Sequence, residues 1–175
     1  ESSEVSAGDT LYLDQYYNDN AEIIINKRVV IIGTGYDTSL TDEQVVATSS
    51  NKLSIKASKT VIKSVKLNEV YLYSDECTID RCYAKHIGVS SVLSGFNHIY
   101  SCYIEGRIVG YASTLSTKLD IQNCVITNGD SSNHSISNLT GSVINNNVLY
   151  KSYYAGSGRV LGNITDSQIT NNLIY

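Results

Sequence analysis

The sequence has no proline, methionine or tryptophan, and it has a single phenylalanine. Lysine and arginine number only 13 in 175 residues, and the formal net charge is −4. Because nucleic acid is bound through clusters of cations, we expect no nucleic-acid partner. No apolar run approaches the ~20 residues of a membrane-spanning helix, so we expect no membrane span. The hydrophobic share of 42% is ordinary, and the length predicts a single domain over residues 1–175.

Long runs of the residues that favour helices are also rare. Valine, isoleucine, threonine, tyrosine, serine and asparagine dominate the chain instead, and these residues are typical of strands and turns. This composition predicts an all-β protein.

One six-residue pattern recurs five times in the second half of the chain and indicates a repeat architecture. Successive copies begin 20, 22, 23 and 25 residues apart, and they occupy 79–84, 99–104, 121–126, 144–149 and 169–174. Repeats of this length, with short strands and polar turns, are typical of solenoids, whose units stack to share one core. A further copy at 62–67 fits the same template.

The positions within the repeat predict a strand, a one-residue corner and a second strand. The third position is mostly asparagine, which tolerates the left-handed conformation that a tight bend needs. We expect the first and fourth positions to point inward and to form columns through the stack. The first column is Ile79, Ile99, Ile121, Ile144 and Ile169, and the fourth is Cys82, Cys102, Cys124, Asn147 and Asn172.

With about 22 residues per coil, the chain predicts a parallel solenoid of about seven to eight coils. An antiparallel sandwich is the alternative topology. A sandwich, however, offers no reason for isoleucine to recur five times at one position.

The first 35 residues carry a more specific resemblance. They read Gly-Asp-Thr-Leu-Tyr-Leu at 8–13, Ile-Ile-Ile-Asn-Lys at 23–27 and Val-Val-Ile-Ile-Gly-Thr-Gly at 29–35. This order resembles the opening of right-handed parallel β-helix proteins of the pectate-lyase-like type, particularly secreted surface proteins of Bacteroides-like bacteria. The resemblance implies a right-handed β-helix with a first coil or cap at 1–35 and repeating coils at 53–175. The strand pattern at 173–175 predicts that the C-terminal end of the stack is open. It also implies a secreted or cell-surface location, with any signal segment already removed.

The chemistry expected of this fold class does not stand out in the sequence. Cleavage of a polysaccharide needs gathered carboxylates, and no column of the repeat holds two. We therefore predict no catalytic residue and no cofactor, although a lyase of this type would use calcium. His98 shares a column with Thr78 and Asp120, which we interpret as a polar ladder on the surface.

The four cysteines do not predict a metal site. Three of them fall in one inward column, and the chain has no C-x-x-C pair of the kind that binds zinc. We expect them to be small buried residues.

Tyrosine is the most unusual feature, with 14 copies. Tyr83 and Tyr103 occupy equivalent outward positions on successive coils. Exposed aromatic rings beside polar groups form a surface on which sugar rings can lie, although stacked tyrosines also stabilise sheets. The predicted ligand-binding set is Tyr83, Tyr100, Tyr103, Asp80, Glu105 and Arg107.

These observations favour a non-catalytic module that binds a polysaccharide or a surface protein through one face. A polysaccharide lyase or hydrolase, or a fragment of one, is the first alternative. The second is a structural stalk, because the repeat stops within a strand pattern at 173–175 and an open end can stack on another copy. Such a stalk would be an end-to-end homo-oligomer joined through the C-terminal coil.

Overall fold

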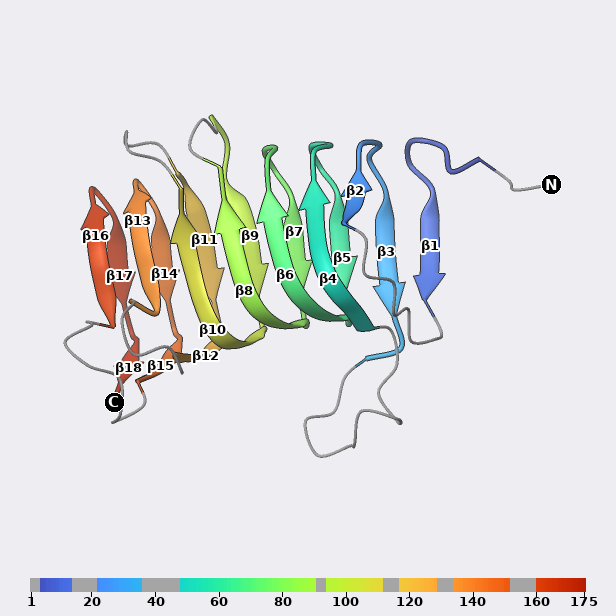
Figure 1. Cartoon of the computed structure of the whole chain (residues 1–175). Helices are drawn as coiled ribbons and strands as arrows, with labels where there is room; N and C mark the ends of the chain where they lie inside the picture. Colours follow the sequence, from blue (N-terminus) through green and yellow to red (C-terminus); the bar gives the residue numbers. More distant parts are fainter. Residues whose placement is uncertain are drawn as a thin grey trace.

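The computed structural model describes residues 4–13, 22–35, 48–90, 94–111, 117–128, 134–151 and 160–175. These segments contain strands and turns but no helix, and so none that could cross a membrane. The strands form two sheets in which every pairing is parallel. The chain alternates between the sheets, which lie one behind the other with the two termini at opposite ends of the stack (Figure 1). The protein is therefore all-β and parallel, as the composition and the repeat predict.

The first sheet, called sheet A, has eight strands in chain order. They are β1 (Thr10–Leu13), β3 (Val30–Gly33), β5 (Val61–Lys63), β7 (Thr78–Asp80), β9 (Asn97–Tyr100), β11 (Leu119–Gln122), β14 (Val143–Asn145) and β17 (Gln168–Thr170). Its register pairs Ile79 with Ile99 and continues through the other first-position isoleucines to Ile169. The same column extends backward through Ile62 and Ile31, so it includes the copy at 62–67.

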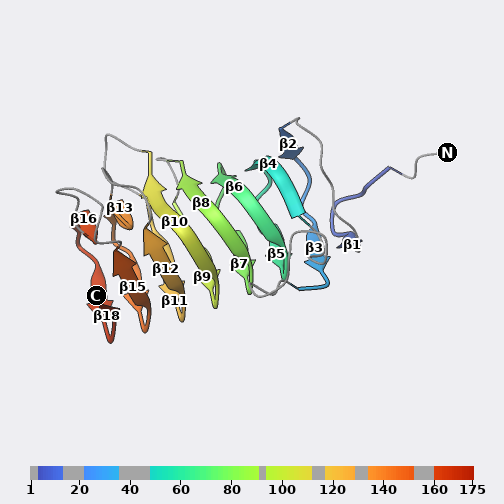
Figure 2. The ribbon, with the colours of Figure 1, turned by 60° about the horizontal axis from the view of Figure 1, so that its bottom comes forward.

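The second sheet, called sheet B, has ten strands and divides after its fifth. Its main path is β2 (Ile23–Ile25), β4 (Thr48–Ile55), β6 (Lys66–Leu72), β8 (Tyr83–Val89), β10 (Tyr103–Gly110), β12 (Val125–Asn128), β15 (Val148–Lys151) and β18 (Leu173–Ile174). The last part of β10 pairs instead with β13 (Ile136–Thr140), which pairs with β16 (Leu161–Thr165). Figure 2 shows the two branches separating beyond β10.

The segment at 36–52 differs from the polar loop that its composition indicates. Residues 48–52 belong to β4, which pairs with both β2 and β6. Residues 36–47 lie outside the described part of the chain. The pairing with β6, which includes Thr48, Ser49 and Lys52, explains the difference, because a parallel neighbour supplies the backbone with hydrogen-bond partners whatever the side chains prefer.

The core lies between the two sheets and is built from the inward columns. Ile79, Ile99, Ile121 and Ile144 have no exposed surface, since each is covered by its neighbours in the column and by sheet B. Ile169 ends the column and is 43% exposed. Leu173 and Ile174, in the last described strand of sheet B, are about half exposed as well. Whether a second copy covers this end stays a prediction.

A single left-handed residue joins sheet A to sheet B in each copy of the repeat. These residues have φ between 49° and 56°, a region that asparagine tolerates better than most residues. The one-residue corner expected from the repeat is therefore confirmed. The corner residues are Arg81, Ser101, Asn123, Asn146 and Asn171.

The fourth-position side chain of each copy satisfies the backbone at this corner. The Cys124 N–H donates to Asn147 Oδ1 at 2.8 Å, and the Asn147 N–H donates to Asn172 Oδ1 at 2.9 Å. Asn147 Nδ2 donates to the Ile121 carbonyl at 3.0 Å. The cysteines take the same role with longer bonds, such as Cys102 Sγ to the Ile79 carbonyl at 3.5 Å. All four cysteines of the chain are free and buried.

Ile121→Asn should lower the free energy of unfolding by about 3 kcal/mol, because it leaves a cavity and buries an amide in the middle of the column. Ile169→Asn is the matched control, since that side chain lies in the same column but is 43% exposed. Urea unfolding of both variants measures the difference. Equal losses at the two positions would contradict the register.

Asn147→Leu should cost about 2 to 4 kcal/mol, because the buried Cys124 N–H and the Ile121 carbonyl both lose a partner. Asn147→Cys should cost less, since a thiol already accepts the equivalent N–H from Cys82 and from Cys102. Thermal unfolding of the pair checks the expectation. A cysteine variant no more stable than the leucine variant would show that the hydrogen bonds contribute little.

Candidate functional site

The six residues that the sequence proposes for ligand binding do not form one surface. Tyr83, Tyr103, Glu105 and Arg107 are on strands β8 and β10 of sheet B, whereas the remaining two are on strands of sheet A. The left-handed corner turns the chain from one sheet to the other between these groups. Residues close in sequence therefore lie on different sides of the molecule. The two on sheet A are Asp80 and Tyr100.

Tyr83 and Tyr103 are neighbours on sheet B, as their equivalent positions predict. Their register pairs them, and their rings stack with centroids 5.7 Å apart and planes 13° apart. The Tyr83 hydroxyl donates to the Glu105 carboxylate, and Lys66 Nζ lies 5.6 Å from the centroid of the Tyr83 ring. Both residues are partly buried, so much of their surface stabilises the sheet.

A row of ionisable residues crosses the same face, one from each of four consecutive strands of sheet B. The register places Lys52 beside Glu69, Glu69 beside His86, and His86 beside Arg107. A β-bulge between Ile104 and Arg107 makes this alignment, since Arg107 follows Tyr103 by four residues but His86 follows Tyr83 by three. The row therefore cannot be recognised in the sequence from a constant interval between its residues.

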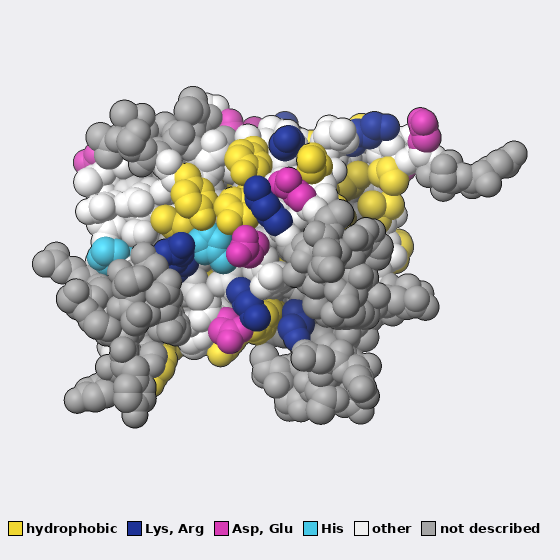
Figure 3. All heavy atoms as spheres, in the orientation of Figure 1, with side chains coloured by type: hydrophobic (Ala, Val, Ile, Leu, Met, Phe, Trp, Pro, Cys, Tyr) yellow, Lys and Arg dark blue, Asp and Glu magenta, His cyan; other side chains and the backbone are white. Residues whose placement is uncertain are grey.

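Beside this row lies a shallow hollow of about 420 Å³, called here the tyrosine hollow. The rings of Tyr71 and Tyr111 stack at 5.8 Å with planes 22° apart, and those of Tyr71 and Tyr73 at 6.3 Å and 19°. Figure 3 shows this face, where hydrophobic, histidine and charged side chains gather over the middle strands of sheet B. The lining residues are Lys52, Tyr71, Tyr73, Ser90 and Tyr111.

Gly88 makes room for these rings. A Cβ atom at Gly88 would lie 2.3 Å from Cε2 of Tyr111 and 2.8 Å from Cδ1 of Tyr71. The two rings therefore lie on the backbone of β8, where any other residue would place a side chain. In the sequence Gly88 interrupts an outward position of a strand, and this was the available signal for a close contact.

Hydrogen bonds hold the tyrosine hydroxyls at the edge of the hollow. The Tyr71 hydroxyl donates to Glu69 Oε2 at 3.0 Å, and Tyr111 Oη lies 2.6 Å from His86 Nε2. Burial, together with hydrogen bonds to Tyr111 and Glu69, raises the pKa of Tyr71 above its ordinary value. Tyr71 therefore stays neutral wherever free tyrosine does.

Lys52 also lines the hollow. Its Nζ lies 3.2 Å from Glu22 Oε1 and 4.7 Å from the centroid of the Tyr71 ring. The hydrogen bond from Ser54, followed by that from Lys52, lowers the pKa of Glu22, and the bond to Glu22 raises the pKa of Lys52. The charge of Lys52 is thus matched by a carboxylate.

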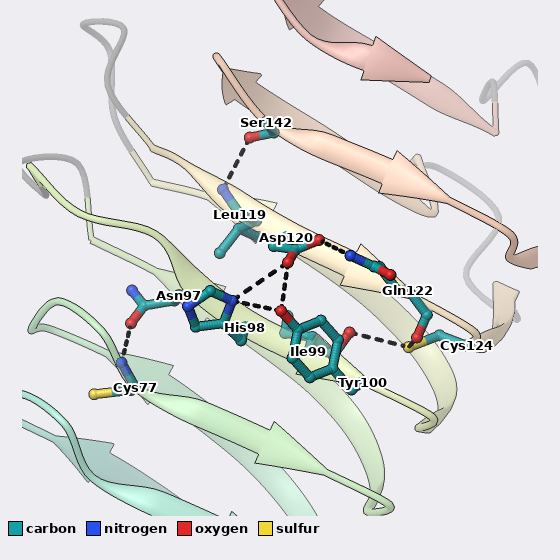
Figure 4. Close-up of polar contacts among 10 residues, drawn as sticks. All are labelled: Cys77, Asn97, His98, Ile99, Tyr100, Leu119, Asp120, Gln122, Cys124 and Ser142. Atoms are coloured by element: carbon teal, nitrogen blue, oxygen red, sulfur yellow. Dashed lines mark hydrogen bonds and ion pairs between the residues drawn. The ribbon is translucent and has the colours of Figure 1, made fainter. Parts of the chain in front are cut away.

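A second polar cluster lies on sheet A, around the pair of His98 and Asp120 that the columns predict (Figure 4). The Tyr100 hydroxyl donates to Asp120 Oδ2, and His98 Nδ1 lies 2.7 Å from Tyr100 Oη and 3.4 Å from Asp120 Oδ2. Gln122 Nε2 donates to the other carboxylate oxygen at 2.6 Å. Burial and Asp120 raise the pKa of Tyr100.

Both carboxylate oxygens of Asp120 therefore have hydrogen-bond partners within the cluster. Asp80, one strand away from Tyr100, forms ion pairs with Lys63 at 3.7 Å and with Arg81 at 3.4 Å. Within the segments that the structure describes, no group of three or more His, Cys, Asp and Glu side chains could hold a metal ion.

Gly88→Ala should displace the rings of Tyr71 and Tyr111 while leaving the sheets intact, at a cost of about 1 kcal/mol. Near-ultraviolet circular dichroism reports the tyrosine packing, and the far-ultraviolet spectrum should not change. Gly95→Ala is the control, since its Cβ would approach nothing closer than 3.4 Å. An unchanged near-ultraviolet spectrum in Gly88→Ala would mean that the rings do not rest on β8.

Comparisons of the chain with protein-family models, curated proteins and solved structures find no match.

Proposed function

We propose that the chain is a right-handed parallel β-helix and acts as a non-catalytic secreted or cell-surface module that binds glycan. The tyrosine hollow is its binding site, with Tyr83 and Tyr103 farther along the same face. The observation that carries this proposal is the group of three tyrosine rings, nearly parallel, around an open hollow on a rigid sheet. Sugar rings present apolar C–H faces that pack on such rings, while their hydroxyl groups need polar partners at the rim.

The rim of the hollow provides these polar partners. Ser90 and Lys52 line it, and the Tyr73 and Tyr111 side chains are 43% and 52% exposed. Exposed aromatic side chains with polar groups around them are typical of a binding surface rather than of a core. Tyr71 lies on β6, and Tyr73 and Tyr111 directly follow β6 and β10, so little ordering is needed when a ligand binds.

The charges around the hollow favour binding over cleavage. Glu22 is engaged by Ser54 and Lys52, and Glu69 accepts the hydrogen bond of Tyr71. Hydrolysis of a glycoside needs one carboxyl group to give a proton and another to act as base or nucleophile. A lyase or hydrolase stays the alternative hypothesis, and product analysis distinguishes it.

The double variant Tyr71→Ala, Tyr111→Ala should bind glycan roughly ten-fold more weakly or worse, because each lost ring removes a stacking contact. A glycan array, run with and without calcium, identifies the ligand, and calorimetry measures the affinity. Analysis of the bound glycan for shorter products tests for cleavage.

The matched control is Tyr12→Ala, Tyr150→Ala, which removes two tyrosines that are 75% and 48% exposed outside the hollow. The double variant Tyr83→Ala, Tyr103→Ala tests the pair that the sequence indicates. Full affinity in the Tyr71, Tyr111 variant would rule out the hollow as the site. Cleavage of the bound glycan would contradict the non-catalytic proposal and support a lyase or hydrolase.

A further inference from the structure

A directed chain of hydrogen bonds runs from Arg107 to the wall of the tyrosine hollow. Arg107 Nε lies 3.4 Å from His86 Nδ1, and His86 Nε2 lies 2.6 Å from Tyr111 Oη. An arginine nitrogen can only donate, so Nδ1 of His86 must be the acceptor and carry no proton. In the neutral imidazole the proton is then on Nε2, which donates to Tyr111.

The contacts of His86 leave this arrangement little freedom. Its ring packs against Tyr71 at 5.8 Å and against Tyr111 at 6.1 Å. Glu69 of β6 and Arg107 of β10 are its partners in the two neighbouring strands, and Lys85 precedes it on β8. Tyr111 in turn rests on Gly88. The Tyr111 hydroxyl therefore has two hydrogen-bond partners, the His86 imidazole at 2.6 Å and the Tyr71 hydroxyl.

We propose that His86 is the residue that positions Tyr111, and that the tyrosine hollow keeps its binding shape only while His86 is uncharged. This inference rests on the proposed function for its consequence, which is the loss of glycan binding at acidic pH. A proton added to Nδ1 would face the N–H of Arg107, so two donors and two positive charges would meet. The imidazole must then turn away from Arg107, and Tyr111 loses the N–H that holds it.

The direction of the pH dependence follows from the surroundings of His86. Burial, and then the charge of Arg107, lower its pKa, while Glu69 opposes them more weakly. The hollow is therefore intact at neutral pH and is lost below the ordinary histidine pKa of about 6.5. Because the unfolded chain binds this proton first, the free energy of unfolding also falls as the pH drops below that value.

The positioning role is tested on the free protein by nuclear magnetic resonance. The imidazole signals of His86 and the ring signals of Tyr111, assigned with Tyr111→Phe, are followed from pH 8 to pH 4. We expect the two to change with one midpoint, below 6.5. Arg107→Met should raise that midpoint, because it removes the neighbouring charge. Tyr111 signals that stay constant while His86 titrates, or an unchanged midpoint in Arg107→Met, would overturn the inference.

The consequence for binding is tested with the strongest oligosaccharide from the glycan array. His86→Gln keeps a donor for Tyr111 but cannot be charged, so it should bind at neutral pH and lose the fall in affinity at acidic pH. His98→Gln, on the other sheet, is the control and should keep the wild-type pH profile. An acid-sensitive His86→Gln variant would contradict the proposal. If no glycan binds at any pH, the proposed function fails, and the resonance titration still decides the role of His86.

Discussion

The in-register pairing of successive repeats is the constraint on which the rest of the structure depends. Each repeat must turn from sheet A to sheet B at the equivalent residue, because otherwise the isoleucines of successive repeats would not pair in one column. A left-handed residue makes that turn, and the side chain after it bonds the backbone of neighbouring repeats. Because the amide or thiol of one repeat bonds the backbone of the preceding repeat, the corner and the register stabilise each other. The core between the sheets follows from this alignment.

The candidate site is a consequence of where the alignment is locally broken. Two bulges, in β4 and in β10, shift the chain by one residue relative to the neighbouring strand. These shifts bring Lys52 and Arg107 into one row with Glu69 and His86. Gly88 lies on β8 two residues after His86, and its missing side chain leaves the space that the tyrosine rings fill. A repeat without these bulges and without Gly88 would not bring these residues together, and it would have no space for the tyrosine rings.

Much of the fold could be read from the repeat, but the site could not. The isoleucine column, the left-handed corners and the inward cysteine and asparagine residues all depend on local spacing, which the sequence displays directly. The predicted ligand set does not form a single surface, because the corner at Ser101 separates Tyr100 on sheet A from Tyr103 on sheet B. Tyr71, Tyr73 and Tyr111 were not singled out, since their positions relative to one another depend on bulges that no local pattern reveals.

The sequence by itself determined that the chain is all-β and that its repeats stack in parallel, because apolar spacing and turn residues act within a few positions of one another. The tertiary structure decided which side chains meet across the repeats. The distance between successive isoleucines of the column, from Ile62 to Ile169, varies between 17 and 25 residues. A fixed number of residues therefore does not lead from one position to its neighbour in the next repeat. Only the pairing of the strands shows which residues are neighbours, and it also brings His86 into contact with Tyr111.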